Sequence, residues 1–177
     1  MSFIVTSTDI RTAKISQMTG NPRVEIAWWI ASTQEQFRIA GTAYIIPASS
    51  HVQQGIINSP EDQEAMAELK REGFDWEMKR RAVFDSMSGH MKATWCRPPP
   101  GSRLEGRYEE AGKSWPKMLP KLGSKENERE LEVALGNFAL VVIEADDVDW
   151  VEMGVIPNRR TRFMRKGGEW LEEALVP

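Results

Sequence analysis

The stretch "VEIAWWIASTQEQFRIAGTAYIIP", residues 24–47, decides the fold predicted for this chain. Over residues 24–31, apolar side chains recur at every second position, which is the period of a strand with one buried face. The polar "STQE" at 32–35 turns the chain, and residues 36–47 have the composition of a second strand. The stretch therefore predicts two consecutive strands.

Two details of these strands carry further expectations. Gly41 lies in mid-strand, which indicates a bulge, a sharp bend or the close approach of a ligand. Trp28 and Trp29 are neighbours, and side chains alternate across a strand, so their rings should lie on opposite faces. One ring would then enter the core, and the other would face a partner or a flat ligand.

Upstream of this stretch, the sequence predicts a strand followed by a short helix. "FIVTS" at 3–7 is rich in β-branched residues, which favour strands. Residues 9–18 predict a helix that Thr8 or Asp9 caps and that "TGNP" at 19–22 ends.

The junction of that strand and helix, "TDIRTAK" at 8–14, is a candidate anion site. Free N–H groups and the dipole at a helix start favour anions, and Arg11 and Lys14 add two cations. Thr8 and Thr12 add hydroxyl donors. Two interpretations stay open: a phosphate-binding corner, or the solvated start of a surface helix.

The rest of the chain shows helix and strand signals without an internal repeat. Helices are predicted over 59–73, from Asp75 onward and over 126–136, and strands over 137–145, 148–156 and 160–166, with a last hairpin at "KGGEW". Residues 97–130 are rich in Gly, Lys, Glu and Pro and predict a loop or an insertion. Six to eight strands that do not alternate with helices predict one barrel-like α+β domain over 1–177.

Composition excludes several classes of protein. The chain has 177 residues, 41% hydrophobic, and a formal net charge of −3, which argues against a nucleic-acid partner. It holds no apolar run long enough to span a membrane, so no membrane partner is predicted. Cys96 is the single cysteine, which favours a reducing compartment and a cytoplasmic location. His51 and His90 are far apart in sequence, and no metal site is predicted.

Three segments, in this order, resemble the pyridoxamine 5′-phosphate oxidase family: "TDIRTAKISQM" (8–18), "NPRVEIAWWIASTQEQFRIAGTA" (21–43) and the closing "VDW…RRTRFMRKGGEWLEEALVP" (148–177). "FDSMSGHMKATWCRPPPGS" (84–102) is similar, more weakly, to an offshoot of that family described as flavin-binding. The resemblance implies a mainly β, α+β fold, the FMN-binding split β-barrel with peripheral helices. It also implies a homodimer that holds its flavin between subunits.

The resemblance implies FMN as cofactor and eight FMN-binding residues: Ser7, Thr8, Arg11, Thr12, Lys14, Gln36, Ser88 and Arg162. The family's Ser-Arg-Lys phosphate corner matches Thr12, Ala13 and Lys14, so Arg11 would replace the arginine from one turn away. Gln36 would meet the flavin, and Arg162 would lie near the isoalloxazine ring. No residue is an evident general acid or base, so no catalytic residue is assigned.

The resemblance further implies an FMN-dependent oxidoreductase whose small-molecule substrate is unknown. The family's substrate histidine has no match in "NRRTRF" at 158–163, which argues against pyridoxamine phosphate. Two alternatives stay open: a non-enzymatic module that binds FMN or haem, and a degenerate homologue that binds no cofactor. The family's first strands carry an Arg-x-Val-Leu-x-Arg/Lys segment, and nothing before Phe3 matches it. An N-terminally incomplete chain is therefore expected.

Overall fold

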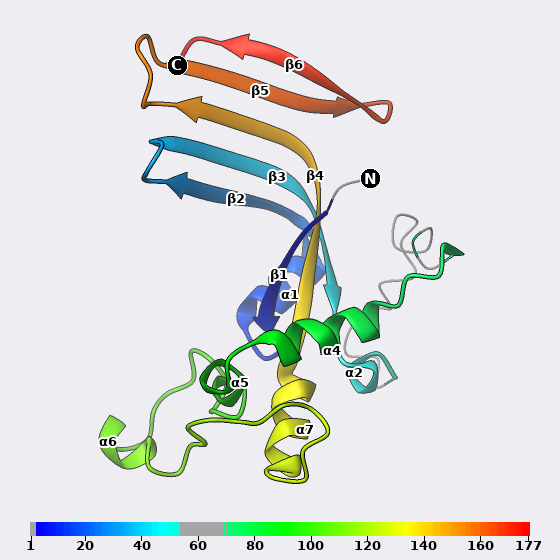
Figure 1. Cartoon of the computed structure of the whole chain (residues 1–177), viewed down its shortest axis with the longest axis vertical. Helices are drawn as coiled ribbons and strands as arrows, with labels where there is room; N and C mark the ends of the chain where they lie inside the picture. The colour runs from blue at the N-terminus through cyan, green and yellow to red at the C-terminus, as the bar shows by residue number, and fades with distance from the viewer. Residues whose placement is uncertain (1–2, 54–68, 70) are drawn as a thin grey trace. The chain divides into compact units, whose positions relative to one another are not determined.

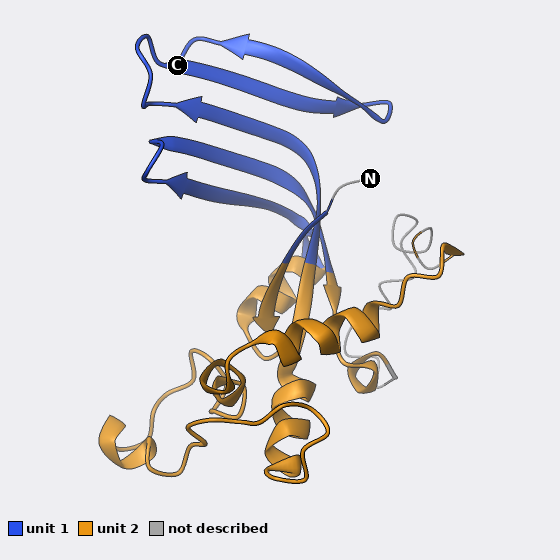
Figure 2. Ribbon diagram, viewed as in Figure 1, with its two compact units in different colours: residues 1–5, 20–44, 142–177 blue, residues 6–19, 45–141 orange. Residues whose placement is uncertain are grey.

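The computed structural model describes residues 3–53, 69 and 71–177. The chain forms two compact units (Figure 2). Unit 1 comprises Met1–Val5, Gly20–Tyr44 and Val142–Pro177, and unit 2 comprises Thr6–Thr19 and Ile45–Val141. Three strands contribute residues to both units, and the helices belong to unit 2 (Figure 1). The helix predicted over 59–73 lies largely outside the described residues.

The described strands form one six-stranded sheet. They are β1 (Phe3–Asp9), β2 (Arg23–Ile30), β3 (Glu35–Ile46), β4 (Phe138–Glu152), β5 (Arg159–Lys166) and β6 (Glu169–Leu175). The order is β2-β3-β4-β5-β6, β1 pairs with β4, and the pairs β2–β3, β4–β5 and β5–β6 are antiparallel. With its helices, this sheet confirms the predicted α+β class.

One face of the sheet in unit 1 is aromatic. Trp28 of β2 pairs with Phe37 of β3, and their ring centroids lie 6.3 Å apart. Phe37 in turn stacks on Trp150 of β4 at 5.8 Å with nearly parallel planes. Trp28 is 58% exposed and Trp29, on the other face, is 50% exposed. The prediction that one of these two rings enters the core is therefore wrong for the chain by itself, because β2 is the end strand of the sheet and both its faces remain open.

The opposite face of the same sheet carries charges that pair across strands. Arg160 and Arg162 of β5 form ion pairs with Asp149 and Asp147 of β4, with N–O distances of 2.7 and 2.5 Å. These carboxylates also explain a difference from the sequence. Two separate strands were predicted over 137–145 and 148–156. The structure has the single strand β4, because the aspartates there find arginine partners and remain in the sheet.

Gly41 lies where β3 meets β4 most closely. A Cβ atom at this position would lie 2.9 Å from the carbonyl carbon of Glu144 and 3.0 Å from the Cα of Ala145. Only a residue without a side chain fits so near another backbone. The sequence suggested the close approach of a ligand as one reason for this glycine, whereas the structure has the backbone of the neighbouring strand β4 there.

Tyr44 and Glu144 form a half-buried polar group in unit 1. The Tyr44 hydroxyl donates to Glu144 at 2.9 Å, and Arg165 of β5 binds the same carboxylate at 2.6 Å. Burial, aided by the hydrogen bond to Glu144, raises the pKa of Tyr44 to about 12. The phenol therefore stays protonated at physiological pH.

The described helices of unit 2 are short. They are α1 (Ala13–Gly20), α2 (Ser49–Gln53), α4 (Trp76–Ser86), α5 (Gly89–Thr94), α6 (Tyr108–Ala111) and α7 (Glu128–Asn137). The start of α4 agrees with the sequence, since Asp75 caps it by accepting from the Met78 N–H at 2.9 Å. Phe84, Trp95 and Phe138 pack their rings together with centroids 5.2 to 6.4 Å apart. This aromatic cluster joins α4, the end of α5 and the start of β4.

Two cations are buried among the described residues of unit 2. Arg80 and Lys92 are each 2% exposed. Arg80 donates to the carbonyls of Leu135 and Phe138 at 2.6 and 2.8 Å, at the C-terminal end of α7 where helix carbonyls lack partners. Lys92 binds Asp85 and the Pro120 carbonyl at 2.9 and 3.1 Å. Arg80 also forms an ion pair with Glu77 at 2.8 Å, so both cations bind backbone carbonyls as well as a carboxylate.

The helix predicted over 9–18 begins four residues later, at Ala13. A turn occupies the intervening residues. The Thr12 N–H donates to the Asp9 carbonyl at 3.1 Å, and the Thr12 hydroxyl donates to it at 2.9 Å. The Asp9 carboxylate accepts from the Arg11 N–H at 2.9 Å. Aspartate side chains favour turns by such local bonds, so Asp9 shapes the turn and does not cap the helix.

Candidate functional site

The start of α1 keeps features of an anion site. The N–H groups of Ala13 and Lys14 donate to no carbonyl among the described residues. The Lys14 side chain is exposed, and no described carboxylate pairs with it. The hydroxyls of Thr8 and Thr12 lie 3.4 Å apart. Three of the predicted residues, Thr8, Thr12 and Lys14, thus lie at the start of α1, near the free N–H groups of Ala13 and Lys14.

Arg11 has partners that the sequence did not indicate. Its guanidinium makes a two-pronged ion pair with Asp9, at 2.9 and 2.7 Å. The same group donates to the carbonyls of Arg97 and Trp95 at 2.9 and 3.2 Å. The charge of Arg11 is therefore neutralised by Asp9, and its remaining donors hold the segment 95–97 against β1. A phosphate would reach Arg11 only in exchange for these contacts.

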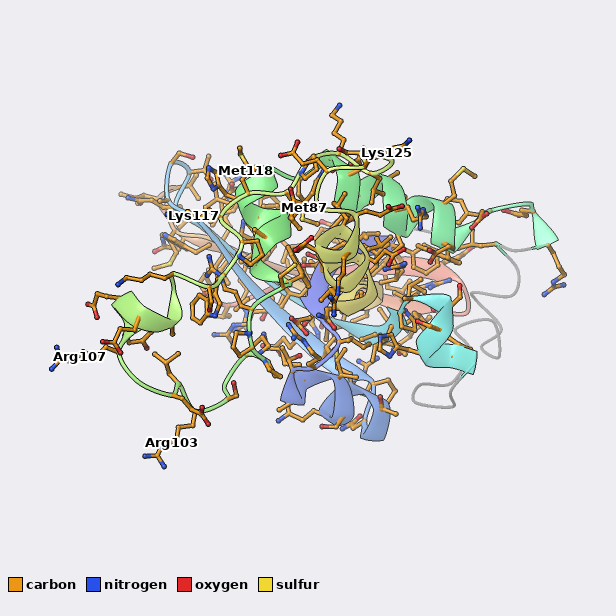
Figure 3. The ribbon with its side chains drawn as sticks, turned by 90° about the horizontal axis from the view of Figure 1, so that it is seen from below. Met87, Arg103, Arg107, Lys117, Met118 and Lys125 are labelled. Atoms are coloured by element: carbon orange, nitrogen blue, oxygen red, sulfur yellow. The ribbon has the colours of Figure 1, made fainter. Side chains whose placement is uncertain are left out.

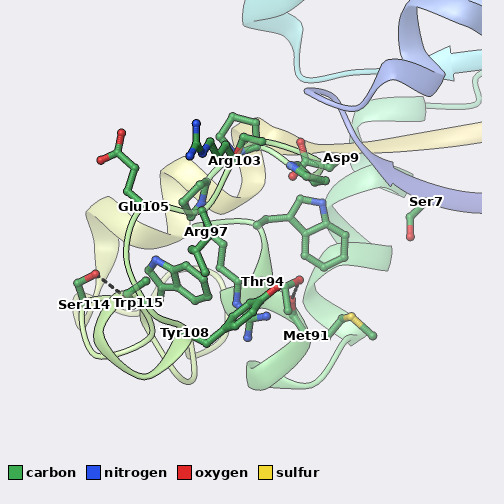
Figure 4. A pocket seen from close by; sticks show the side chains of 17 residues that line it. Ser7, Asp9, Met91, Thr94, Arg97, Arg103, Glu105, Tyr108, Ser114 and Trp115 are labelled. Carbon is green, nitrogen blue, oxygen red and sulfur yellow. Dashed lines mark hydrogen bonds between the residues drawn. The ribbon is translucent and has the colours of Figure 1, made fainter.

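A cavity of about 940 Å³ opens beside this corner within unit 2 (Figure 4). Ser7 and Asp9 of β1 form one wall, α5 contributes Met91 and Thr94, and residues 95–115 supply the rest. Ser7, a predicted FMN contact, is exposed at its rim. The cavity therefore lies on the Asp9 side of the candidate phosphate corner.

Ser88 has a structural role next to this cavity. It caps α5, and its hydroxyl accepts from the N–H of Met91 at 3.2 Å. Met91 lines the cavity, but Ser88 does not. The hydroxyl hydrogen of Ser88 remains available to a ligand, because the capping bond uses only the oxygen as acceptor.

Gln36 and Arg162 belong to the sheet of unit 1. Gln36 is half-buried on β3 and pairs with Trp29. Arg162 lines a shallow cavity of about 290 Å³ with Arg38, Asp147 and Asp149, and Gln36 is not part of that lining. The hydrogen bond to Asp147 raises the pKa of Arg162 further above its ordinary value. Arg162 is thus a cation that already has a carboxylate partner.

The side chains that sequence reasoning missed lie in the segment 97–130, which was expected to be a loop or an insertion. Arg97 holds its guanidinium 5.5 Å from the centre of the Trp115 ring. Tyr108 of α6 lines the same cavity. Large aromatic residues are unusual in a mobile polar loop, and Tyr108 and Trp115 were the available signal.

Cys96 lies beside the cavity wall and is half-buried. Its thiol donates to the Glu130 carbonyl at 3.2 Å, and burial raises its pKa. Over the described part of the chain, no group of three or more His, Cys, Asp or Glu side chains could hold a metal ion. The described helices include none with the length and apolar character needed to cross a bilayer.

Comparison with known proteins supports the resemblance. The model of the family described as pyridoxamine 5′-phosphate oxidase, FMN-binding domain, matches residues 1–47. A comparison with curated proteins finds no match.

Two solved structures are similar to the chain. One is a pyridoxamine 5′-phosphate oxidase-related, FMN binding protein from Nostoc punctiforme, with 24% identity and a TM-score of 0.66, covering 99% of this chain and 73% of that one. The other is PhzG from Burkholderia lata, in complex with tetrahydrophenazine-1-carboxylic acid, with 15% identity and a TM-score of 0.49, covering 98% and 68%. The Nostoc structure confirms the predicted fold.

The matched segment contains β1, α1, β2 and β3, and with them six of the eight predicted FMN contacts. The prediction of FMN is confirmed at the level of the family, since the matched domain is described as FMN-binding. Residues 1–47 therefore match the FMN-binding domain of the pyridoxamine 5′-phosphate oxidase family, and the first two segments of the resemblance, 8–18 and 21–43, lie within this match.

Proposed function

We propose that this chain binds FMN and acts as a flavin-dependent oxidoreductase resembling pyridoxamine 5′-phosphate oxidase. The observation that carries the proposal is the match of residues 1–47 to the FMN-binding domain, which includes the corner at the start of α1. A similar fold in an FMN binding protein from Nostoc punctiforme supports it.

The phosphate group of FMN fits the residues of that corner. Lys14 supplies an exposed cation, and the N–H groups of Ala13 and Lys14 supply free donors at the positive end of α1. Thr8 and Thr12 supply hydroxyls. Arg11 stabilises the corner indirectly, because its guanidinium binds both Asp9 and the backbone carbonyls of the segment 95–97. Gln36 and Arg162 stay predictions as contacts of the flavin ring.

Bound FMN would supply hydride and electron transfer, and the chain would supply binding and orientation. A binding module without turnover has the same corner and is the second candidate. Assays of the purified flavoprotein with NAD(P)H and with oxygen separate the two, because only an oxidoreductase changes the flavin spectrum during turnover.

The test of the phosphate corner is Lys14→Ala, with FMN and riboflavin titrated in parallel. Charged hydrogen bonds contribute about 1.5–3 kcal/mol, so FMN affinity should fall roughly tenfold or more, while riboflavin, which lacks the phosphate, should change little. Lys79→Ala removes an exposed lysine of α4 and is the matched control. Equal losses of affinity for FMN and riboflavin would mean that the FMN phosphate does not bind at this corner.

We also propose a homodimer. On the aromatic face, Trp28 is exposed and Phe37 and Trp150 are half-buried, and a two-fold interface covers such a face by pairing it with itself. Light scattering measures the mass, and Trp28→Glu should shift it from dimer toward monomer. A monomeric mass for the unaltered chain contradicts the proposal.

A further inference from the structure

The cavity in unit 2 contains a cation without a carboxylate partner. The Arg97 guanidinium lies over the Trp115 ring at 5.5 Å, and none of the described residues pairs it with Asp or Glu. An arginine stacked on an indole keeps its in-plane N–H groups free, and these form a fork that matches the two oxygens of a carboxylate. Arg97 is therefore prepared to bind an anion (Figure 4).

Flat aromatic side chains surround this cation. Trp115 and Tyr108 line the same cavity, and Tyr108 is 76% exposed. Trp95 also lines it, is 7% exposed, and its indole N–H is buried without an acceptor among the described residues. Together the three rings favour a planar ligand.

The charges of the lining favour a single negative charge. Asp9 is neutralised by its ion pair with Arg11. The lining then holds two further cations, Arg97 and Arg103, and one further carboxylate, that of Glu105. Residues 97–125 as a whole hold seven Lys or Arg and three Glu, in a chain whose net charge is −3. The side of the molecule that carries the cavity is thus locally positive, with Arg103 and Arg107 reaching outward beside α6 (Figure 3).

We propose that this cavity binds a planar aromatic carboxylate, with the carboxylate on the Arg97 fork and the ring against Trp115 and Tyr108. Such a compound is the substrate class of the flavoprotein, a role that rests on the proposed function. A carboxylate suits the site better than a phosphate ester because one planar fork and one net positive charge match a planar monoanion.

The test is a calorimetric titration of the full chain with 2-naphthoate, in the absence of added FMN. The neutral 2-naphthamide has the same ring and should bind roughly tenfold more weakly or worse, since it loses the charged hydrogen bonds. Arg97→Ala should weaken 2-naphthoate to a similar extent and leave the amide unchanged. Arg97→Lys keeps the positive charge but loses the planar fork, so its affinity for 2-naphthoate should lie between that of the unaltered chain and that of Arg97→Ala.

Arg107→Ala is the matched control, because Arg107 is an exposed cation of the same segment that does not line the cavity. It should leave the 2-naphthoate affinity unchanged. Equal binding of acid and amide, no binding of 2-naphthoate, or no effect of Arg97→Ala would each overturn the proposal. Displacement of 2-naphthoate by an equal concentration of inorganic phosphate would also overturn it, by assigning the cavity to phosphate.

A separate FMN titration distinguishes this inference from the proposed function. Arg97→Ala should leave FMN affinity unchanged, because Arg97 contacts the corner only through its backbone carbonyl, which the substitution keeps. If FMN fails to bind while 2-naphthoate binds through Arg97, the proposed function fails and the cavity assignment stands. If FMN binds and 2-naphthoate does not, the cavity assignment fails and the proposed function stands.

Discussion

Unit 1 and unit 2 hold their charged side chains in different ways. The sheet of unit 1 pairs arginine with aspartate on different strands, at positions that remain partly exposed. Unit 2 buries Arg80 and Lys92 almost completely and binds them to backbone carbonyls as well as to carboxylates. Exposed pairs contribute little to stability, whereas a buried group that loses its partner is strongly destabilising. Removing a charged side chain should therefore lower the free energy of unfolding more in unit 2 than in unit 1.

The largest effect is expected at Arg80. Arg80→Met keeps much of the side-chain volume but leaves the carbonyls of Leu135 and Phe138 without their donor. Each unsatisfied buried group costs about 1–3 kcal/mol, so the free energy of unfolding should fall by roughly 2–5 kcal/mol. Urea denaturation measures it. Arg81→Met, at the exposed neighbour on α4, should change it by less than about 1 kcal/mol; comparable losses would erase the contrast between buried and exposed charge.

A smaller effect, of opposite sign in the two units, is expected at two glycines. Gly41→Ala in unit 1 forces a methyl group against the backbone of β4 and should lower the free energy of unfolding by about 1–3 kcal/mol. Gly136→Ala in unit 2 meets nothing within 4 Å and lies in α7, so it should raise stability by up to about 1 kcal/mol. Thermal unfolding of both variants checks the signs, and destabilisation by Gly136→Ala would contradict the helix-propensity argument.

The smallest effect is expected at Asp149, on the charged face of unit 1. The hydrogen bond from Arg160 holds the pKa of Asp149 below its ordinary value. A carboxyl of this kind contributes stability above its unfolded pKa of about 3.9, and that contribution is lost as pH falls through the folded pKa. Asp149→Asn should therefore cost less than about 1 kcal/mol at pH 7 and flatten the pH dependence below pH 4. Urea titrations from pH 7 to pH 3 test this; an unchanged acid slope would mean that other carboxylates dominate.

Much of the sheet could be predicted because its apolar positions follow the period of a strand. The strands predicted over 24–31 and 36–47 correspond to β2 and β3, while the strand that lies close to Gly41 was not foreseen. The continuous β4 was not expected, since the acidic residues near 146 look like a loop until the arginines of other strands are known. Pairing between distant residues is not visible in local composition.

The candidate site was predicted in part for the same reason. The corner at 8–14 was found because its cations and hydroxyls are neighbours in sequence. The hydrogen bonds of Arg11 to Asp9, Trp95 and Arg97 were not predicted, because two of these three partners are more than 80 residues away in the sequence. The pairing of Arg97 with Trp115 was missed in turn, since only the folded segment brings the cation over the ring.

The end strands β2 and β6 differ in how readily another chain should pair with them. An end strand exposes unpaired backbone donors and acceptors, which can recruit a strand of another chain and start aggregation. At one end, β6 exposes Trp170 and Leu171 but also carries Glu169, Glu172 and Glu173, whose charges repel a second copy laid alongside. At the other end, β2 presents exposed Trp28 and Trp29 with little charge beside them. Unwanted strand addition in concentrated solution should therefore begin at β2.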